Sequence, residues 1–164
     1  YSGSTMGNLP MGQGLSVTPM QMVAGYAAIA DGGILKQPQL IKRVGEREIH
    51  EPKGRRVIEP SVAAEVREML EGVLAAGGTA SAVSVPGYTL AGKTGTAQVA
   101  ENGTYSETKY IASFIGFAPA QNPKFLAAVI VDQPQGEIYG GSVAAPAFGQ
   151  IAEFTLPYLG VPQE

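Results

Sequence analysis

Residues 92–96 read G-K-T-G-T and form the densest group of chemically useful residues in the chain. Lys93 carries a positive charge, while Thr94 and Thr96 carry hydroxyl groups that can donate hydrogen bonds. Gly95 has no side chain, so a ligand or another backbone can approach it closely. These residue types suit the binding of a phosphate or a carboxylate, and two different architectures could present them.

One such architecture is the phosphate-binding P-loop. Residues 87–94 satisfy its pattern, G-x-x-x-x-G-K-[ST], and Asp132 follows an apolar run, as a magnesium-directing carboxylate would. A P-loop, however, opens a helix whose N-terminus holds the phosphates. The residues after Thr94 are β-favouring and soon reach the turn dipeptide Asn102-Gly103, which leaves no room for that helix. The sequence therefore disfavours a nucleotide-binding site.

The other architecture is a β-strand that carries Lys-Thr-Gly. Side chains alternate along a strand, so we predict Lys93 and Gly95 on one face and Thr94 and Thr96 on the other. If this strand borders a cleft, its main chain could pair with an extended peptide. One of its N–H groups could also serve an oxyanion hole. For an isolated tripeptide, the alternative is that Lys93 simply extends into solvent.

The elements around this motif predict an antiparallel sheet. Three strand-like runs lie at residues 88–99, 110–118 and 125–132. Their connections are shorter than the dozen or more residues of a parallel crossover, so the three strands are expected to form a meander. Upstream, residues 40–44 and 56–58 are expected to form the two edges of a small exposed ribbon.

Three helices are predicted to accompany the sheet. The first begins with a capping box of Thr18 and Gln21 and ends at Gly32-Gly33. The second starts near Pro60 and ends at Gly77-Gly78; its apolar face is expected to hold Val62, Val66, Met69, Leu70 and Val73. The third spans residues 145–156. Helices beside an antiparallel sheet predict an α+β fold.

Composition excludes several kinds of site. The 164 residues hold 11 Lys+Arg and 14 Asp+Glu, a net charge of −3, so nucleic-acid binding is disfavoured. Cysteine is absent, which excludes disulfides and thiolate metal sites, and the single histidine, His50, cannot form a histidine cluster. No metal site and no cofactor are predicted. Met6, Met11, Met20 and Met22 are interpreted as packing residues. No apolar run approaches the length of a membrane span.

Four blocks, taken in order, resemble one known family. They are G-Q-G-L-S-V-T-P-M-Q-M with A-A-I-A-D-G-G (residues 12–22 and 27–33), V-P-G-Y-T-L-A-G-K-T-G-T-A (85–97), S-F-I-G-F-A-P (113–119) and Y-G-G-S-V-A-A-P-A-F (139–148). Together they span nearly the whole chain. They are similar to the C-terminal part of the transpeptidase domain of class B penicillin-binding proteins.

The resemblance implies an incomplete β-lactamase/transpeptidase-like fold, an antiparallel sheet flanked by helices. It also implies a D,D-transpeptidase that cross-links peptidoglycan through an acyl-serine intermediate. The expected partners are stem peptides ending in D-Ala-D-Ala, β-lactam antibiotics and other cell-wall synthesis proteins. The expected location is the extracytoplasmic face of the bacterial cell membrane, reached through an N-terminal anchor outside this chain.

The resemblance also assigns roles to the motif. Lys93, Thr94 and Gly95 correspond to the K-T-G of the family. The hydroxyls of Thr94 and Thr96 are expected to bind the terminal carboxylate, and the N–H of Thr96 is expected to be an oxyanion donor. Lys93 is expected to support the carboxylate and bias the neighbouring proton network. Tyr139, Gly140 and Gly141 are interpreted as a structural turn rather than as a border of the substrate groove.

The chain departs from the family pattern in its nucleophile. It contains no S-x-N, and its one S-x-x-K is Ser106 to Lys109, after K-T-G rather than before it. An exposed, protonated lysine there could not act as a base, so this match is interpreted as accidental. Residues 1–164 are expected to be the C-terminal portion of a single domain whose nucleophile lies upstream of Tyr1, and to be inactive alone. Alternatives are a degenerate or β-lactam-sensing module and a serine β-lactamase.

Overall fold

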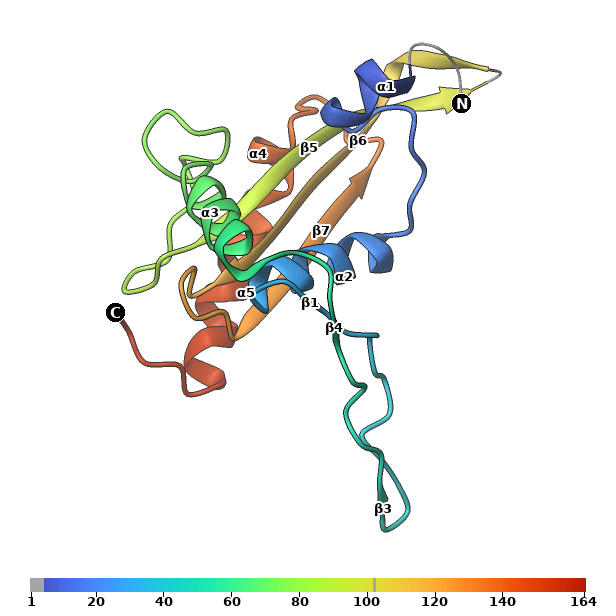
Figure 1. Ribbon diagram of the computed structural model, residues 1–164. Helices are drawn as coiled ribbons and strands as arrows, with labels where there is room; N and C mark the ends of the chain where they lie inside the picture. Colours follow the sequence, from blue (N-terminus) through green and yellow to red (C-terminus); the bar gives the residue numbers. More distant parts are fainter. Residues whose placement is uncertain (1–4, 102) are drawn as a thin grey trace.

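A three-stranded antiparallel sheet forms the centre of the molecule. The computed structural model describes residues 5–101 and 103–164. Its sheet has the order β5-β6-β7 and confirms the predicted meander (Figure 1); the strands are β5 (Ala91–Glu101), β6 (Thr104–Ala118) and β7 (Phe125–Asp132). Of the predicted turn, Asn102 lies outside the described residues, and Gly103 has a φ of 81°.

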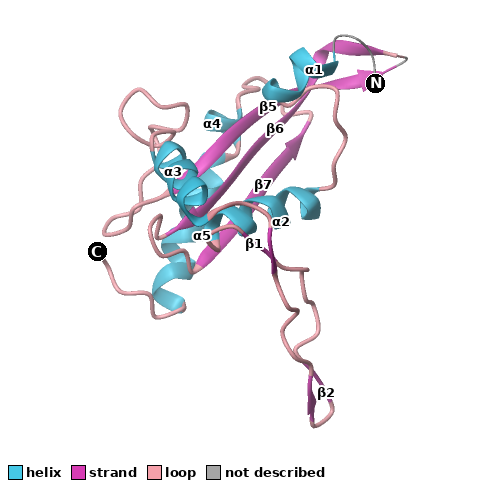
Figure 2. Ribbon diagram, in the orientation of Figure 1, coloured by secondary structure: helices cyan, strands magenta, loops and turns pink. Residues whose placement is uncertain are grey.

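Helices cover both faces of this sheet, which confirms the predicted α+β class (Figure 2). One face carries α2 (Pro19–Ala30) and α3 (Pro60–Glu71). The other carries α5 (Ala145–Tyr158), which follows the short α4 (Gly140–Val143). The sheet therefore has a hydrophobic core on each side.

The core beneath α5 is aromatic. Phe148, Ala152 and Leu156 recur at i, i+4 and i+8 on α5 and are fully buried. The Phe148 ring lies 4.9 Å from the ring of Phe114 on β6 and 5.9 Å from that of Phe125 on β7. These contacts fix α5 across β6 and β7, the strands that support β5.

The core beneath α2 and α3 is smaller. Phe117 of β6 and Ala91 of β5 pack there against Leu70 of α3 and Tyr26 of α2. Burial raises the pKa of the Tyr26 phenol, because the phenolate would lose solvation. This core holds the first residue of β5 against two helices.

The sequence predicts the start of α2 correctly, but it predicts the end of α3 incorrectly. Thr18 caps α2, and its capping box with Gln21 is present as predicted. The helix α3 ends at Glu71 rather than at the predicted Gly77-Gly78, because residues 72–80 fold into successive turns. Ala63 and Leu70 of this helix are buried and Val66 is half-buried, whereas Val62 and Met69, expected on that face, are exposed.

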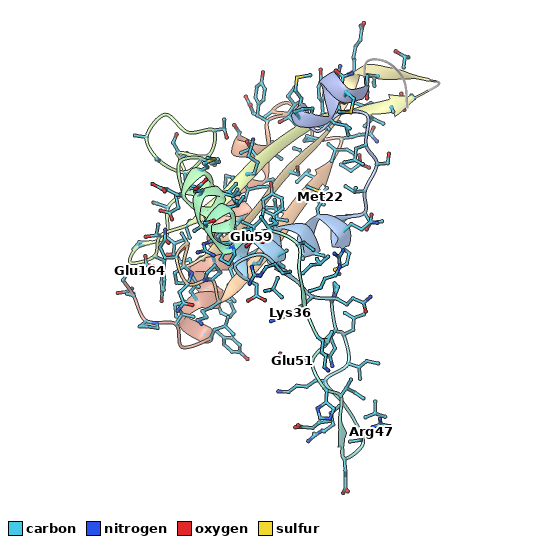
Figure 3. The ribbon with its side chains drawn as sticks, viewed as in Figure 1. Met22, Lys36, Arg47, Glu51, Glu59 and Glu164 are labelled. Atoms are coloured by element: carbon cyan, nitrogen blue, oxygen red, sulfur yellow. The ribbon has the colours of Figure 1, made fainter. Side chains whose placement is uncertain are left out.

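A long arm projects from the body between α2 and α3 (Figure 1), and we define it as residues 36–54. The predicted pairing of residues 40–44 with 56–58 is wrong. A tight turn at Gly45, with a φ of 60°, folds the arm back on itself instead. Figure 3 shows Arg47 and Glu51 along the arm, away from the sheet. The arm and its base contain four two-residue strands: β1 (Ile34–Leu35) pairs with β4 (Arg55–Arg56), and β2 (Arg43–Val44) with β3 (Arg47–Glu48).

The segment before α2 contains α1 (Thr5–Asn8) and the 3₁₀ turn η1 (Leu9–Met11). The expectation that its methionines are packing residues is not met within the described structure. Met6 is 79% exposed, Met11 is 72% exposed, and Met20 and Met22 at the start of α2 are also exposed, because no other described element covers them. Among the described residues, no helix combines the length and the apolar character that a membrane crossing needs.

Candidate functional site

The K-T-G motif lies on a strand at the edge of the sheet. Lys93 pairs with Ile115, and Thr96 pairs with Ala112, along the β5–β6 ladder. Within the described part of the chain, no strand pairs with the other edge of β5. The predicted strand is therefore present, and one of its edges is open to an extended ligand.

The side chains alternate as predicted. Thr94 lies opposite Phe114 in the register and faces α4 and α5, as does Thr96. Gly95 lies on the other face, where a Cβ would come 2.5 Å from the hydroxyl oxygen of Ser113. Lys93 is exposed, and its ammonium donates to the Thr94 carbonyl at 3.1 Å.

Each hydroxyl of the motif contacts a segment far away in the chain. The Thr94 and Thr79 hydroxyl oxygens are 2.7 Å apart. The Thr96 hydroxyl accepts a hydrogen bond of 3.1 Å from the backbone N–H of Gly140 at the start of α4. Neither Thr79 nor the Gly140 N–H was predicted from the sequence to contact the motif. The glycine pairs Gly77-Gly78 and Gly140-Gly141 were the sequence signals that could have pointed to these two segments.

The two glycines at the start of α4 allow this close approach. A Cβ on Gly140 would collide with the carbonyl oxygens of Gly95 and Ser113, and one on Gly141 would collide with the Thr79 carbonyl. The interpretation of residues 139–141 as a structural turn is therefore incomplete. The turn packs directly on the K-T-G strand and orients one of its hydroxyls.

The C-terminal segment holds the turn that leads into β5. The Tyr88 hydroxyl donates to the Val161 carbonyl at 2.7 Å. The Glu164 N–H donates to the Gly87 carbonyl at 2.9 Å, and a Glu164 carboxylate oxygen accepts from the Thr89 N–H at 2.7 Å. These bonds fix the entry to the strand four residues before Lys93.

Ser106 and Lys109 do not form a nucleophile–base pair. Ser106 lies on β6, near the hairpin end, and its hydroxyl oxygen accepts from the Lys109 N–H at 3.1 Å. The Lys109 ammonium instead contacts Glu101 at 2.5 Å. The side chains of Ser106 and Lys109 are thus engaged in local contacts. Lys93, in contrast, has no carboxylate partner among the described ion pairs.

Other candidate sites in the described residues are sparse. No group of three His, Asp or Glu is placed to hold a metal ion there. Two cavities, of about 350 and 510 Å³, are lined by residues near Leu74 and near Gly160, and neither includes residues 93–96. The K-T-G strand is therefore an open surface rather than an enclosed pocket.

Residues 3–153 match the family of the penicillin binding protein transpeptidase domain. Stage V sporulation protein D of Bacillus subtilis is 43% identical over 92% of this chain and 24% of its own length. The probable peptidoglycan D,D-transpeptidase PenA of Neisseria flavescens is 39% identical over 93% of this chain and 37% of its own length. The chain thus spans between a quarter and two fifths of these relatives.

Solved structures agree with the sequence relatives. Penicillin-binding protein 3 of Mycobacterium tuberculosis, in complex with ampicillin, superposes with a TM-score of 0.89 at 38% identity, over all of this chain and 40% of that protein. The transpeptidase domain of Burkholderia pseudomallei penicillin-binding protein 3 gives 0.81 at 42% identity, over 93% of this chain and 45% of that one. With the edge strand and its K-T-G motif, these matches show that the chain belongs to the penicillin-binding protein transpeptidase family.

Proposed function

We propose that this chain forms one side of the active-site groove of a serine D,D-transpeptidase. The parent protein would cross-link peptidoglycan stem peptides through an acyl-serine intermediate and would be acylated by β-lactams. The observation that carries the proposal is the unpaired edge of β5, in the described structure, beside Lys93, Thr94 and Thr96. Such an edge can hold the end of an extended peptide by main-chain hydrogen bonds.

The main chain of Thr96 is suited to oxyanion binding. In an antiparallel strand, the N–H and C=O of one residue point to the same edge, and the edge alternates along the strand. Because the Lys93 ammonium reaches the Thr94 carbonyl, we infer that Thr94 faces the open edge. Thr96, two residues later, would share that orientation and direct its N–H toward a reacting carbonyl.

The hydroxyls and the ammonium suit the terminal carboxylate of a D-Ala-D-Ala stem peptide. Since the Thr96 oxygen accepts from Gly140 N–H, its own proton is free to be donated to a ligand. Thr94 has the same capacity once its partner Thr79 donates to it. Lys93, exposed and without an acidic partner among the described ion pairs, would add positive charge.

The nucleophile is proposed to lie outside these residues. Residues 93–96 provide donors and charge, and the described partners of their hydroxyls, the Thr79 hydroxyl and the Gly140 N–H, are not groups that could activate a nucleophile. We propose that residues 1–164 are the C-terminal portion of one transpeptidase domain, and that the rest of that domain supplies S-x-x-K and S-x-N. The exposed apolar side chains before and at the start of α2 support this, because they would be buried against that portion; they include Met6, Met11, Leu15 and Met20.

The cellular setting follows from the same proposal. A transpeptidase that acts on peptidoglycan works at the extracytoplasmic face of the bacterial membrane, together with other cell-wall synthesis proteins. The membrane anchor would belong to a part of the parent outside this chain. The isolated chain is expected not to turn over substrate.

Mass spectrometry tests the proposal. The full-length parent is incubated with a penicillin, its intact mass is measured, and the modified peptide is mapped. We expect one covalent adduct on a serine outside residues 1–164. A folded parent without an adduct would favour a degenerate or sensing module, and an adduct on Ser106 would overturn the assignment of the groove.

A further inference from the structure

Thr79 is joined to the K-T-G strand by one hydroxyl–hydroxyl contact. Its oxygen lies 2.7 Å from that of Thr94, although Thr79 belongs to the turns between α3 and β5. We propose that Thr79 is a positioning residue, which orients the Thr94 hydroxyl so that its proton points at the carboxylate of the bound acyl donor. This inference rests on the function proposed above.

The backbone of Thr79 is fixed from both sides. Its neighbour Ala80 is only 2% exposed, and the Ala80 N–H donates to the Val73 carbonyl at 2.9 Å. Its own carbonyl lies against Gly141, where no Cβ would fit. Thr79 is therefore placed by a core residue and by α4, independently of β5.

The number of hydroxyl protons sets the direction of the contact. Each threonine hydroxyl has one proton to donate and two acceptor positions. A carboxylate only accepts, so Thr94 can donate to it only if Thr79 supplies the proton of the 2.7 Å contact. The two hydroxyls then form a short chain in which each bond polarises the next.

Thr96 has an orienting donor of a different kind. The Gly140 N–H is a backbone donor, whose direction is fixed by the start of α4. The two motif hydroxyls are thus oriented by separate groups, one a side chain and one a backbone. Only the first can be removed by a simple side-chain substitution, which makes Thr79 the testable member of the pair.

The test compares Thr79→Val and Thr79→Ser in the full-length parent, with Thr108→Val on the exposed face of β6 as the matched control. Stopped-flow acylation by a fluorescent penicillin separates the initial dissociation constant from the acylation rate constant. We expect Thr79→Val to raise the dissociation constant roughly 3- to 10-fold, because it removes one hydrogen bond between neutral groups, the bond that orients the Thr94 hydroxyl. Thr79→Ser and Thr108→Val should stay within about twofold of wild type.

A double substitution measures the coupling between Thr79 and Thr94. If Thr79 acts through Thr94, then Thr79→Val should have no further effect on the dissociation constant in a Thr94→Val background. Equal losses in both backgrounds, or wild-type binding by a folded Thr79→Val protein, would overturn the inference. So would unfolding of both Thr79→Val and Thr79→Ala, because the hydroxyl would then be structural. Absence of acylation in the wild type would instead overturn the proposed function.

Discussion

The K-T-G strand and the arm are both rich in polar groups, but they differ in how those groups are held. Thr94 and Thr96 are each bonded to a distant segment, and Gly140 packs without space against the strand. The arm also carries Lys42, Arg43 and Arg47, yet every described side chain of its tip is exposed. A cluster of charges becomes a binding site only when the surrounding structure fixes its geometry.

The contrast has a physical origin. The part of β5 that carries the motif pairs with the second half of β6, which is buried by helices on both faces, so the backbone of β5 is held there by two cores. The arm is held by pairs of two-residue strands, and an isolated hairpin of that kind is only marginally stable in water. Substitutions should therefore have large effects around β5 and small effects in the arm.

A large effect on stability is expected from Gly140→Ala. The new Cβ would collide with the carbonyl oxygens of Gly95 and Ser113, so the backbone of two strands would have to move. We expect a loss of about 3 kcal/mol in unfolding free energy, measured by chemical denaturation of the full-length parent. Gly25→Ala on α2, where nothing lies within 4 Å, is the control and should be neutral or slightly stabilising. Equal stability of the two variants would contradict the close packing.

Lys93→Gln should impair function without impairing folding. Lys93 is exposed, so the melting temperature should hardly change, whereas the acylation rate by a penicillin should fall roughly 100-fold through the loss of a charged donor. The same change in the arm, Lys42→Gln, should leave both quantities as in wild type. Similar acylation rates for the two variants would remove the distinction between the strand and the arm.

Tyr88→Phe should have an intermediate effect on stability. The substitution removes the hydrogen bond to the Val161 carbonyl, which ties the C-terminal segment to the entry of β5. We expect a cost of about 1 kcal/mol by thermal or chemical unfolding. Tyr105→Phe, at an exposed position of β6, provides the comparison and should cost less. A larger cost at Tyr105 would show that the C-terminal segment does not stabilise the strand.

The smallest effect is expected from Leu40→Ala at the side of the arm. Leu40 is 92% exposed, so its truncation should change the unfolding free energy by less than about 0.5 kcal/mol. Leu90, 5% exposed just before β5, should cost about 2–5 kcal/mol when truncated in the same way. A marked destabilisation by Leu40→Ala would mean that the arm is packed against another part of the parent.

The parts of the fold that depend on neighbouring residues were predictable from the sequence. The capping box at Thr18 is a contact across three residues, and the meander follows from short connections. The alternation of Lys93 and Thr94 needs only the geometry of a strand. These features were sufficient to predict the fold class and the position of the motif.

The parts that depend on tertiary contacts were not predictable in this way. Thr79 is 15 residues from Thr94, and Gly140 is 44 residues from Thr96, so only the folded chain brings them together. The pairing of the arm was missed because the turn at Gly45 is short and the flanking strands are charged, without an apolar alternation that would set their register. An apolar residue such as Met6 is buried only where another element covers it.

A crystal structure of the full-length parent acylated by a penicillin would test the central proposal most directly. We expect the acyl oxygen to accept from the Thr96 N–H, and the penicillin carboxylate to lie beside Lys93 and the hydroxyls of Thr94 and Thr96. The ligand should run along the open edge of β5. A ligand that makes no contact with residues 93–96, or another strand of the protein paired with that edge, would contradict the proposed groove.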